Sequence, residues 1–216
     1  MDFEKARFNM VEQQVRPWSV LDQSVLDLLF AVHREDFVPP AYRALAFADL
    51  EIPLGDGERM WTPKMEARVL QELDLKEGES VLEIGTGSGY LTALLARSAG
   101  EVVSVEINAR LQADARAHLT AAAIRNVRLE RGDGARGWRS DVYDAIVLTG
   151  STPILPDAWV KQLKPGGRLF AVVGDPPVMT ARLTRWSAAD AITRENLFET
   201  VLAPLKNAPQ PARFVF

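Results

Sequence analysis

The chain has 216 residues, of which 47% are hydrophobic and 25% are charged, and its formal net charge is −4. This length and apolar content suffice for one domain with a substantial core. The acidic balance excludes a protein whose affinity comes from contacts with nucleic-acid phosphates. We therefore expect a soluble globular protein without a nucleic-acid partner.

The sequence contains no cysteine and only two histidines, His33 and His118. The lack of cysteine excludes a disulfide framework, a thiolate zinc site and a cysteine nucleophile. His118 is expected to be a surface or packing residue, and two isolated histidines do not form a metal site. The N-terminus has no apolar signal core, and no uninterrupted apolar stretch is long enough to cross a bilayer. We expect a cytoplasmic protein that binds neither a metal nor a membrane.

The first 62 residues are interpreted as an N-terminal helical extension with a loop on the substrate side. Apolar residues at helical spacing predict two helices in this extension, the second capped by Asp22. The expected elements are a helix from Asp2 to Gln14, a break at 16–18, a helix over 24–32, a short turn over 41–46, and a loop with edge-strand character over 49–60.

Residues 63–216 are expected to form the second part of one compact unit. Pro63 suits the first turn of an amphipathic helix that ends at Leu73. Beyond Ser80, strands and helices alternate, as a parallel sheet requires. The strands are predicted near 81–84, 102–105, 127–130, 144–149 and 168–173, with 178–187 and 195–203 as an antiparallel edge. The pattern predicts a three-layer, doubly wound α/β fold with a mostly parallel seven-stranded sheet.

The segment Val81–Tyr90 carries the strongest functional signal. An apolar strand leads directly into glycines at alternate positions, and a helix-forming stretch follows, which is the arrangement that binds adenosine-containing cofactors. The third glycine comes one residue earlier than in the dinucleotide pattern G-x-G-x-x-G. The spacing E-x-G-x-G-x-G, which begins at Glu83, instead resembles the first motif of class I S-adenosylmethionine-dependent methyltransferases. The alternative is a glycine turn that serves only packing of strand against helix.

Two acidic residues follow later strands of the predicted sheet. Glu106 ends the second strand about 20 residues after the first glycine, where an acid binds the ribose hydroxyls in nucleotide-binding units. A solvated strand end is the alternative for Glu106. In the methyltransferase pattern, Asp133 faces the adenine amino group, and Gly132 and Gly134 leave room for the ring. Asp133 is otherwise a simple turn residue.

The resemblance extends to one family, the protein-L-isoaspartate O-methyltransferases, and runs in order from about residue 7 to residue 174. The segments that carry it are Met10–Val15, Val32–Pro39, Ala46–Asp49, Ile52–Gly55, Leu82–Tyr90, Gly132–Gly134 and Leu163–Gly167. The resemblance implies S-adenosyl-L-methionine as methyl donor, S-adenosyl-L-homocysteine as product, and the carboxylate of a damaged protein or peptide as acceptor. The implied cofactor-binding residues are Glu83, Gly85, Thr86, Gly87, Ser88, Gly89, Glu106, Ile107, Gly132, Asp133, Gly134 and Thr149.

The chain departs from this family between Gly57 and Pro63. The family carries Gln-Thr-Ile-Ser-Gln there, whereas this chain has Glu-Arg-Met-Trp-Thr, so that Trp61 replaces the serine. An indole is far larger than a hydroxyl and offers only one donor. The expected substrate pocket comprises Met60, Trp61, Thr62 and Pro63, and the Thr62 hydroxyl is the candidate catalytic group. Trp61 either reshapes the acceptor pocket or packs as a wall over the cofactor; if it obstructs, Trp61→Ser is expected to raise isoaspartyl activity.

The chemistry of carboxylate methylation demands little from the protein. A carboxylate is already ionised at neutral pH, so no general base is required and alignment with desolvation is sufficient. Asp175-Pro176-Pro177 resembles a motif of amino-group methyltransferases but follows the fifth strand rather than the fourth, and is interpreted as a turn. Two alternatives remain: a methyltransferase of the same fold with another protein or small-molecule acceptor, and a cofactor-binding protein without methyl transfer.

Overall fold

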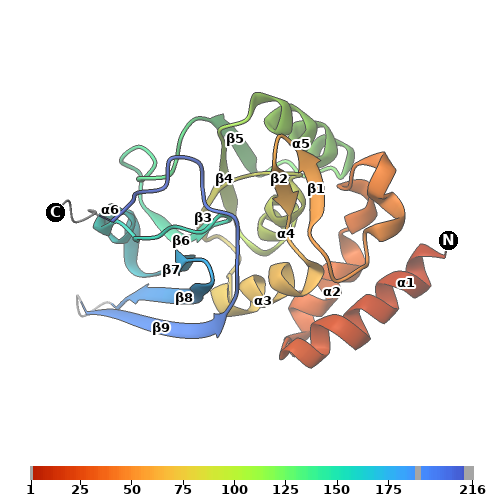
Figure 1. Cartoon of the computed structure of the whole chain (residues 1–216). Helices are drawn as coiled ribbons and strands as arrows, with labels where there is room; N and C mark the ends of the chain where they lie inside the picture. Colours follow the sequence, from red (N-terminus) through yellow and green to blue (C-terminus); the bar gives the residue numbers. More distant parts are fainter. Residues whose placement is uncertain (1, 188–190, 212–216) are drawn as a thin grey trace.

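The computed structural model describes residues 2–187 and 191–211, so the last five residues of the expected methyltransferase part lie outside the described region. One seven-stranded sheet crosses the molecule in the order β5-β4-β3-β6-β7-β8-β9 (Figure 1). Its strands are β3 (Ser80–Ile84), β4 (Glu101–Glu106), β5 (Val127–Arg131), β6 (Tyr143–Leu148), β7 (Leu163–Asp175), β8 (Val178–Trp186) and β9 (Ile192–Glu199).

Strands β3 to β7 run parallel, and β8 and β9 add the antiparallel edge. Alternate residues of the central strands enter two separate apolar clusters: Val81 and Val147 lie in one, whereas Leu82 and Ile146 lie in the other. The sheet is therefore buried on both faces, as a parallel sheet requires. This confirms the predicted doubly wound fold with a mostly parallel seven-stranded sheet.

Three helices cover the first face of the sheet: α3 (Pro63–Leu73), α4 (Tyr90–Ser98) and α5 (Ala109–Ala121). Pro63 lies in the first turn of α3, as predicted. The second face is covered by α6 (Asp157–Lys161), whose Trp159 is completely buried. Sequence analysis missed α6 because its five residues are too few to show a helical period.

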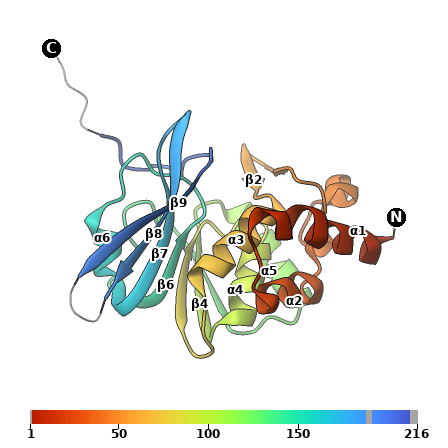
Figure 2. The same ribbon diagram turned by 90° about the horizontal axis from the view of Figure 1, so that it is seen from below.

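The N-terminal extension packs onto the same face as α3 and α4 (Figure 2). It contains α1 (Phe3–Met10), α2 (Gln23–Ala31) and four short turns of 3-10 or π geometry, at Val11–Val15, Arg16–Trp18, Arg34–Asp36 and Pro40–Leu45. The Asp22 carboxylate accepts a hydrogen bond of 2.9 Å from the Ser24 amide, which confirms the predicted cap. The first predicted helix to Gln14 is α at its start and π-helical from Val11 onward.

Residues 49–60, predicted as a loop with edge-strand character, form a hairpin of β1 (Ile52–Gly55) and β2 (Glu58–Met60). The hairpin is held to α5 by Arg110, which donates to the Leu54 carbonyl at 2.7 Å and to the Asp56 carboxylate at 3.1 Å. β2 leads directly into α3. A Cβ atom on Gly87 would lie 3.4 Å from the Leu54 side chain, so the hairpin lies beside the glycine turn that joins β3 to α4.

Two predicted strands have other bounds in the structure. β7 begins at Leu163 rather than 168, and β9 covers Ile192–Glu199 rather than 195–203. The residues after β9 leave the sheet and cross back toward β6, where Ser151 and Leu205 bond through their backbones. Asp175 lies at the turn between β7 and β8, in agreement with the interpretation of Asp175-Pro176-Pro177 as a turn.

Candidate functional site

A cavity that is open to solvent lies at the carboxyl ends of β3, β4 and β6. Ligands of open parallel sheets bind at this edge, because the strand order reverses there and the chain leaves a crevice. The cavity brings together most of the residues predicted for the cofactor and the acceptor. The predicted residues that line it are Met60, Trp61, Glu83, Gly85, Thr86, Gly87, Ser88, Glu106, Ile107, Gly132, Asp133, Gly134 and Thr149.

The glycine turn forms the floor of the cavity. Gly85 has a φ of +98°, and a Cβ atom there would lie 2.1 Å from the Thr149 hydroxyl oxygen. That hydroxyl bonds to the carbonyls of Ile84 and Gly85, both at 2.8 Å. Thr149, which directly follows the neighbouring strand β6, therefore holds the end of β3 in place. Only glycine fits at position 85.

Glu83 is completely buried beneath the turn and lines the cavity. Its Oε2 atom accepts hydrogen bonds from Thr92 at 2.5 Å and from Ser104 at 2.6 Å, and the Ser104 hydroxyl also bonds to Thr86. Its Oε1 atom has no hydrogen-bond partner within the described chain. Burial, with a smaller contribution from the nearby Glu106 carboxylate, raises the pKa of Glu83 to about 8 against the opposing effect of the hydrogen bonds from Ser104 and Thr92.

Glu106 stands at the end of β4, where both of its oxygen atoms are already held. Oε2 accepts from the Gly87 amide at 2.9 Å, and Oε1 accepts from the Asn108 amide at 2.9 Å. The carboxylate thereby links the glycine turn to the start of α5. Each of its oxygen atoms has a further lone pair, so that the carboxylate can still accept hydrogen bonds from a ligand in the cavity.

The far wall is formed by the segment that follows β5. Asp133 is exposed, and its two oxygen atoms accept from the Ala135 amide at 3.0 Å and from the Asn207 side chain at 2.8 Å. A Cβ atom on Gly132 would lie 2.3 Å from the Trp138 ring. Ile107 is 36% exposed and offers an apolar side chain at the same wall.

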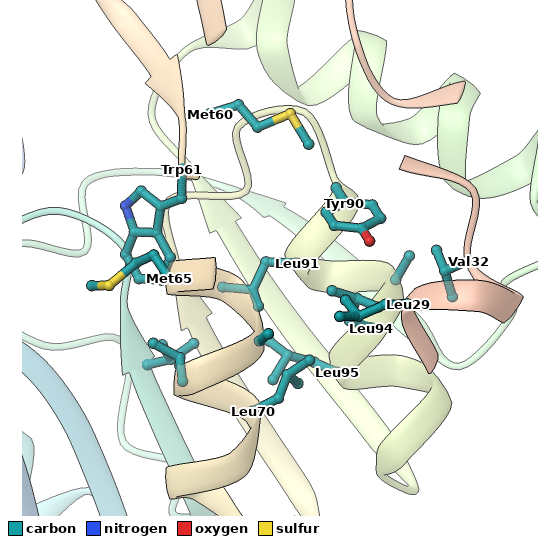
Figure 3. Close-up of a cluster of buried hydrophobic side chains, with 14 of the residues drawn as sticks. Leu29, Val32, Met60, Trp61, Met65, Leu70, Tyr90, Leu91, Leu94 and Leu95 are labelled. Carbon is teal, nitrogen blue, oxygen red and sulfur yellow. The ribbon is translucent and has the colours of Figure 1, made fainter. Parts of the chain in front are cut away.

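The side of the cavity that was predicted for the acceptor is formed by β2 and its junction with α3. Trp61 is only 6% exposed and packs edge-to-face against Phe170, with ring centroids 6.4 Å apart. Figure 3 shows the Trp61 indole beside Met65, whereas Met60 extends in the opposite direction. Thr62 and Pro63 are not among the residues that line the cavity, and Thr62 is the residue that precedes α3. The structure thus separates Thr62 and Pro63 from the predicted pocket residues Met60 and Trp61.

Sequence reasoning missed Arg34, which holds this junction in place. Its guanidinium is 1% exposed, donates to the carbonyls of Ala46 at 2.8 Å and Trp61 at 2.5 Å, and forms an ion pair with Glu66. It also lies 5.0 Å from the centroid of the Tyr90 ring. The only signal in the sequence was its place in the family phrase at 32–39, since a buried arginine has no periodicity that marks it.

Sequence reasoning also missed the strap at 202–206, which covers part of the cavity. Its base is fixed because the Ser151 hydroxyl donates to the Leu202 carbonyl at 2.8 Å. Its far end joins the hairpin through Lys206, whose ammonium lies 2.8 Å from a Glu58 oxygen. The Glu58 carboxylate raises the pKa of Lys206.

His118, expected to be a surface or packing residue, lies half-buried on α5. Its Nδ1 atom is 2.9 Å from the Ser88 carbonyl, and its ring packs against Phe37. Across residues 2–187 and 191–211, no group of three or more histidine, aspartate or glutamate residues is placed to bind a metal ion. The described helices are all too short or too polar to span a lipid bilayer.

The residues of the cavity fit S-adenosylmethionine. Acidic side chains outnumber basic ones in the lining, and the buried Glu83 Oε1 atom has no partner in the part of the chain that the structure describes. A cofactor with a sulfonium and an ammonium group supplies the positive charge that such a site requires. The glycine floor leaves the backbone open for close approach of the ligand.

Comparison with known proteins gives the same assignment. The family model for protein-L-isoaspartate(D-aspartate) O-methyltransferase matches residues 5–208. The chain belongs to this family. A Rhodopseudomonas palustris protein-L-isoaspartate O-methyltransferase 1 is 41% identical over 94% of this chain and 84% of its own length. The Anaeromyxobacter dehalogenans protein-L-isoaspartate O-methyltransferase is 42% identical over 88% of this chain and 92% of its own.

Solved structures agree on the fold. A Plasmodium falciparum protein assigned to the same enzyme class, solved with S-adenosyl-L-homocysteine, has a TM-score of 0.80 at 18% identity and covers 95% of this chain and 98% of its own. A second protein-L-isoaspartate O-methyltransferase structure has a TM-score of 0.78 at 26% identity, covering 93% of this chain and 65% of its own. The predictions of the family, the fold, the methyltransferase class and the cofactor are confirmed.

Glu106→Gln is expected to raise the KM for S-adenosylmethionine at least about tenfold, because a neutral amide is a weaker acceptor than a carboxylate for hydroxyl donors. Steady-state kinetics with varied cofactor measure the change. Glu101→Gln is the matched control, since Glu101 is exposed at the opposite end of β4. An equal KM in Glu106→Gln and Glu101→Gln would show that Glu106 does not contact the cofactor.

Binding of the cofactor is expected to release a proton from Glu83. The raised pKa, about 8, leaves Glu83 mainly protonated at pH 7 in the free protein. A cationic ligand favours the ionised carboxylate and lowers this pKa, so affinity rises with pH by up to about tenfold per unit until pH 8 is reached. Calorimetry in two buffers of different ionisation enthalpy counts the released protons. Glu83→Gln should abolish the release, and an undiminished release in that variant would assign the proton to another group.

Proposed function

We propose that this chain transfers the methyl group of S-adenosylmethionine to the free carboxylate of isoaspartyl residues in damaged proteins. The observation that carries the proposal is the match to protein-L-isoaspartate O-methyltransferases at 41% identity over 94% of the chain. The proposal also agrees with a cavity that combines carboxylates for a cationic cofactor with an apolar junction at β2 and α3.

The cofactor supplies an activated methyl group on a sulfonium. The protein's own residues bind and orient the cofactor and the acceptor, and they exclude water from the site. The buried Glu83 and the fixed carboxylate of Glu106 provide negative charge for the cofactor, and the strap at 202–206 shields it from solvent. Met60 and Trp61 keep the acceptor side dry, which favours transfer to a poorly solvated carboxylate. No group in this arrangement is required to take a proton, since the acceptor is ionised at neutral pH.

The test is a transfer assay with methyl-labelled cofactor and two peptides that differ only in one linkage. One peptide contains an isoaspartyl residue and the other a normal aspartyl residue. We expect base-labile methyl ester on the isoaspartyl peptide alone. Tight cofactor binding without transfer to either peptide would contradict the proposal.

A second function is favoured by one observation. Trp61 stands at the position of the family serine and lines the cavity, so the acceptor surface differs from that of the family pattern. The second candidate is therefore a methyltransferase of the same fold that acts on another carboxylate, on a protein or a small molecule. Transfer to a mixture of free carboxylic acids, with none to the isoaspartyl peptide, would support it.

A further inference from the structure

Acidic residues outnumber basic residues in the cavity lining by six to two. Four acidic residues remain after Glu83, which is mainly protonated at pH 7 in the free protein, and Glu66, which is paired with Arg34, are set aside. The acidic residues are Glu51, Glu58, Glu66, Glu83, Glu106 and Asp133, and the basic residues are Arg59 and Lys206. Such a cavity attracts a cationic cofactor and repels an anionic acceptor. A cation of the lining that has no carboxylate partner would therefore favour binding of an acceptor carboxylate.

Lys206 is not available for that purpose, because its ammonium is paired with Glu58 at 2.8 Å. Arg34 is not available either, since it is buried behind Trp61 and bound to Glu66. Arg59 is exposed, and it forms no ion pair and donates no side-chain hydrogen bond within residues 2–187 and 191–211. It is the one cation of the described cavity lining that has no carboxylate partner.

The hairpin register fixes the position of Arg59. Arg59 pairs with Pro53, and Met60 pairs with Ile52, so Arg59 lies on the hairpin face opposite the buried Met60 and Ile52. Its strand continues directly into Trp61, at the acceptor side of the cavity. Arg59 is therefore an exposed member of the cavity lining that directly precedes Met60 and Trp61, two of the residues predicted for the acceptor pocket.

We propose that Arg59 is a specificity-determining residue that recognises the carboxylate of the acceptor. The planar guanidinium matches a carboxylate through two parallel hydrogen bonds, which a single ammonium does not reproduce. Methylation turns the acceptor carboxylate into a neutral ester, so that Arg59 binds the substrate and releases the product. This inference rests on the proposed function, because it names the group that selects the acceptor.

The test compares the binding of two β-linked peptides to the protein saturated with S-adenosyl-L-homocysteine. One peptide carries the free carboxylate of an isoaspartyl residue, and the other carries the neutral amide in its place. We expect the wild type to bind the carboxylate at least about tenfold more tightly, as a charge-assisted hydrogen bond predicts. The ratio of the two affinities, carboxylate peptide over amide peptide, should fall close to one in Arg59→Gln. Arg59→Lys should retain part of the preference for the carboxylate peptide.

Arg116→Gln is the matched control, because Arg116 is exposed on α5, outside the cavity lining, and the substitution removes the same charge. Its ratio is expected to equal that of the wild type. An unchanged ratio in Arg59→Gln would overturn the inference. So would weaker binding of S-adenosyl-L-homocysteine with an unchanged peptide ratio, which would assign Arg59 to the carboxylate of the cofactor.

The transfer assay separates this inference from the proposed function. If the wild type methylates the isoaspartyl peptide and Arg59→Gln keeps the ratio, only the inference fails. If the ratio is lost in Arg59→Gln and no methyl group is transferred, the inference stands and the proposed function fails. If the wild type binds neither peptide, both fail.

Discussion

Replacing Arg34 with methionine is expected to lower the free energy of unfolding by about 3–5 kcal/mol, the range for breaking a buried ion pair from one side. The guanidinium is 1% exposed, and its partners come from three separate segments: the Ala46 carbonyl, the Trp61 carbonyl and the Glu66 carboxylate. Removal of the guanidinium leaves these three acceptors in the protein interior without a hydrogen-bond donor. Each unpaired buried acceptor then lowers the stability of the folded state.

Urea unfolding of the two proteins measures the loss. The double variant Arg34→Met/Glu66→Leu should recover part of it, because the uncompensated carboxylate is removed together with the guanidinium. Lys76→Met is the matched control, since Lys76 and Asp74 form an ion pair whose side chains are 65% and 62% exposed. That pair should contribute less than about 1 kcal/mol. An Arg34→Met variant as stable as Lys76→Met would show that the buried network contributes little.

We expect the same network to affect function, because Arg34 binds the carbonyl of Trp61, which lines the cavity at the side predicted for the acceptor. Without the hydrogen bond from Arg34, the junction between β2 and α3 can move more. Small displacements of a reacting group lower the rate of the chemical step considerably. We therefore expect Glu66 and Arg34 to serve as positioning residues, which act through Trp61 rather than by contact with the reacting atoms.

Replacing Trp61 with serine is expected to cost about 3–5 kcal/mol of stability, as for other large-to-small substitutions of buried aromatic residues. The indole is only 6% exposed and packs against Phe170, so serine leaves a void in the main apolar cluster. The sequence suggested that this change would raise isoaspartyl activity if the indole obstructs the pocket. The burial of the indole favours the other interpretation, in which it is a wall of the cavity.

We accordingly expect that Trp61→Ser does not raise the turnover of isoaspartyl peptides per folded molecule, measured well below the melting temperature. Trp159→Ser is the matched control: it removes an equally buried indole from the second cluster, outside the cavity lining. The control should lose comparable stability. A rise in turnover for Trp61→Ser alone would identify the indole as an obstacle to the acceptor.

Much of the fold was predictable because its signals are local. Asp22 caps α2 by bonding to the amide two residues later, and Pro63 opens α3, so both boundaries depend on a few neighbouring residues. The strands were predictable from short apolar runs. The helix α6 and the true end of β9 were missed, because the first is too short for a period and the second depends on where the chain leaves the sheet.

The sequence by itself determined the cofactor side of this protein. Gly85, Gly87 and Gly89 lie within one turn that is separated from Glu106 by a single helix and strand, and the spacing alone brings them to one sheet edge. Only the tertiary structure showed which contacts hold the residues that were predicted for the acceptor side. The Trp61 carbonyl accepts a hydrogen bond from Arg34, 27 residues away in the chain, and Lys206 forms an ion pair with Glu58, which is distant in the sequence. Such contacts exist only after distant segments pack together, and no local pattern in the sequence encodes them.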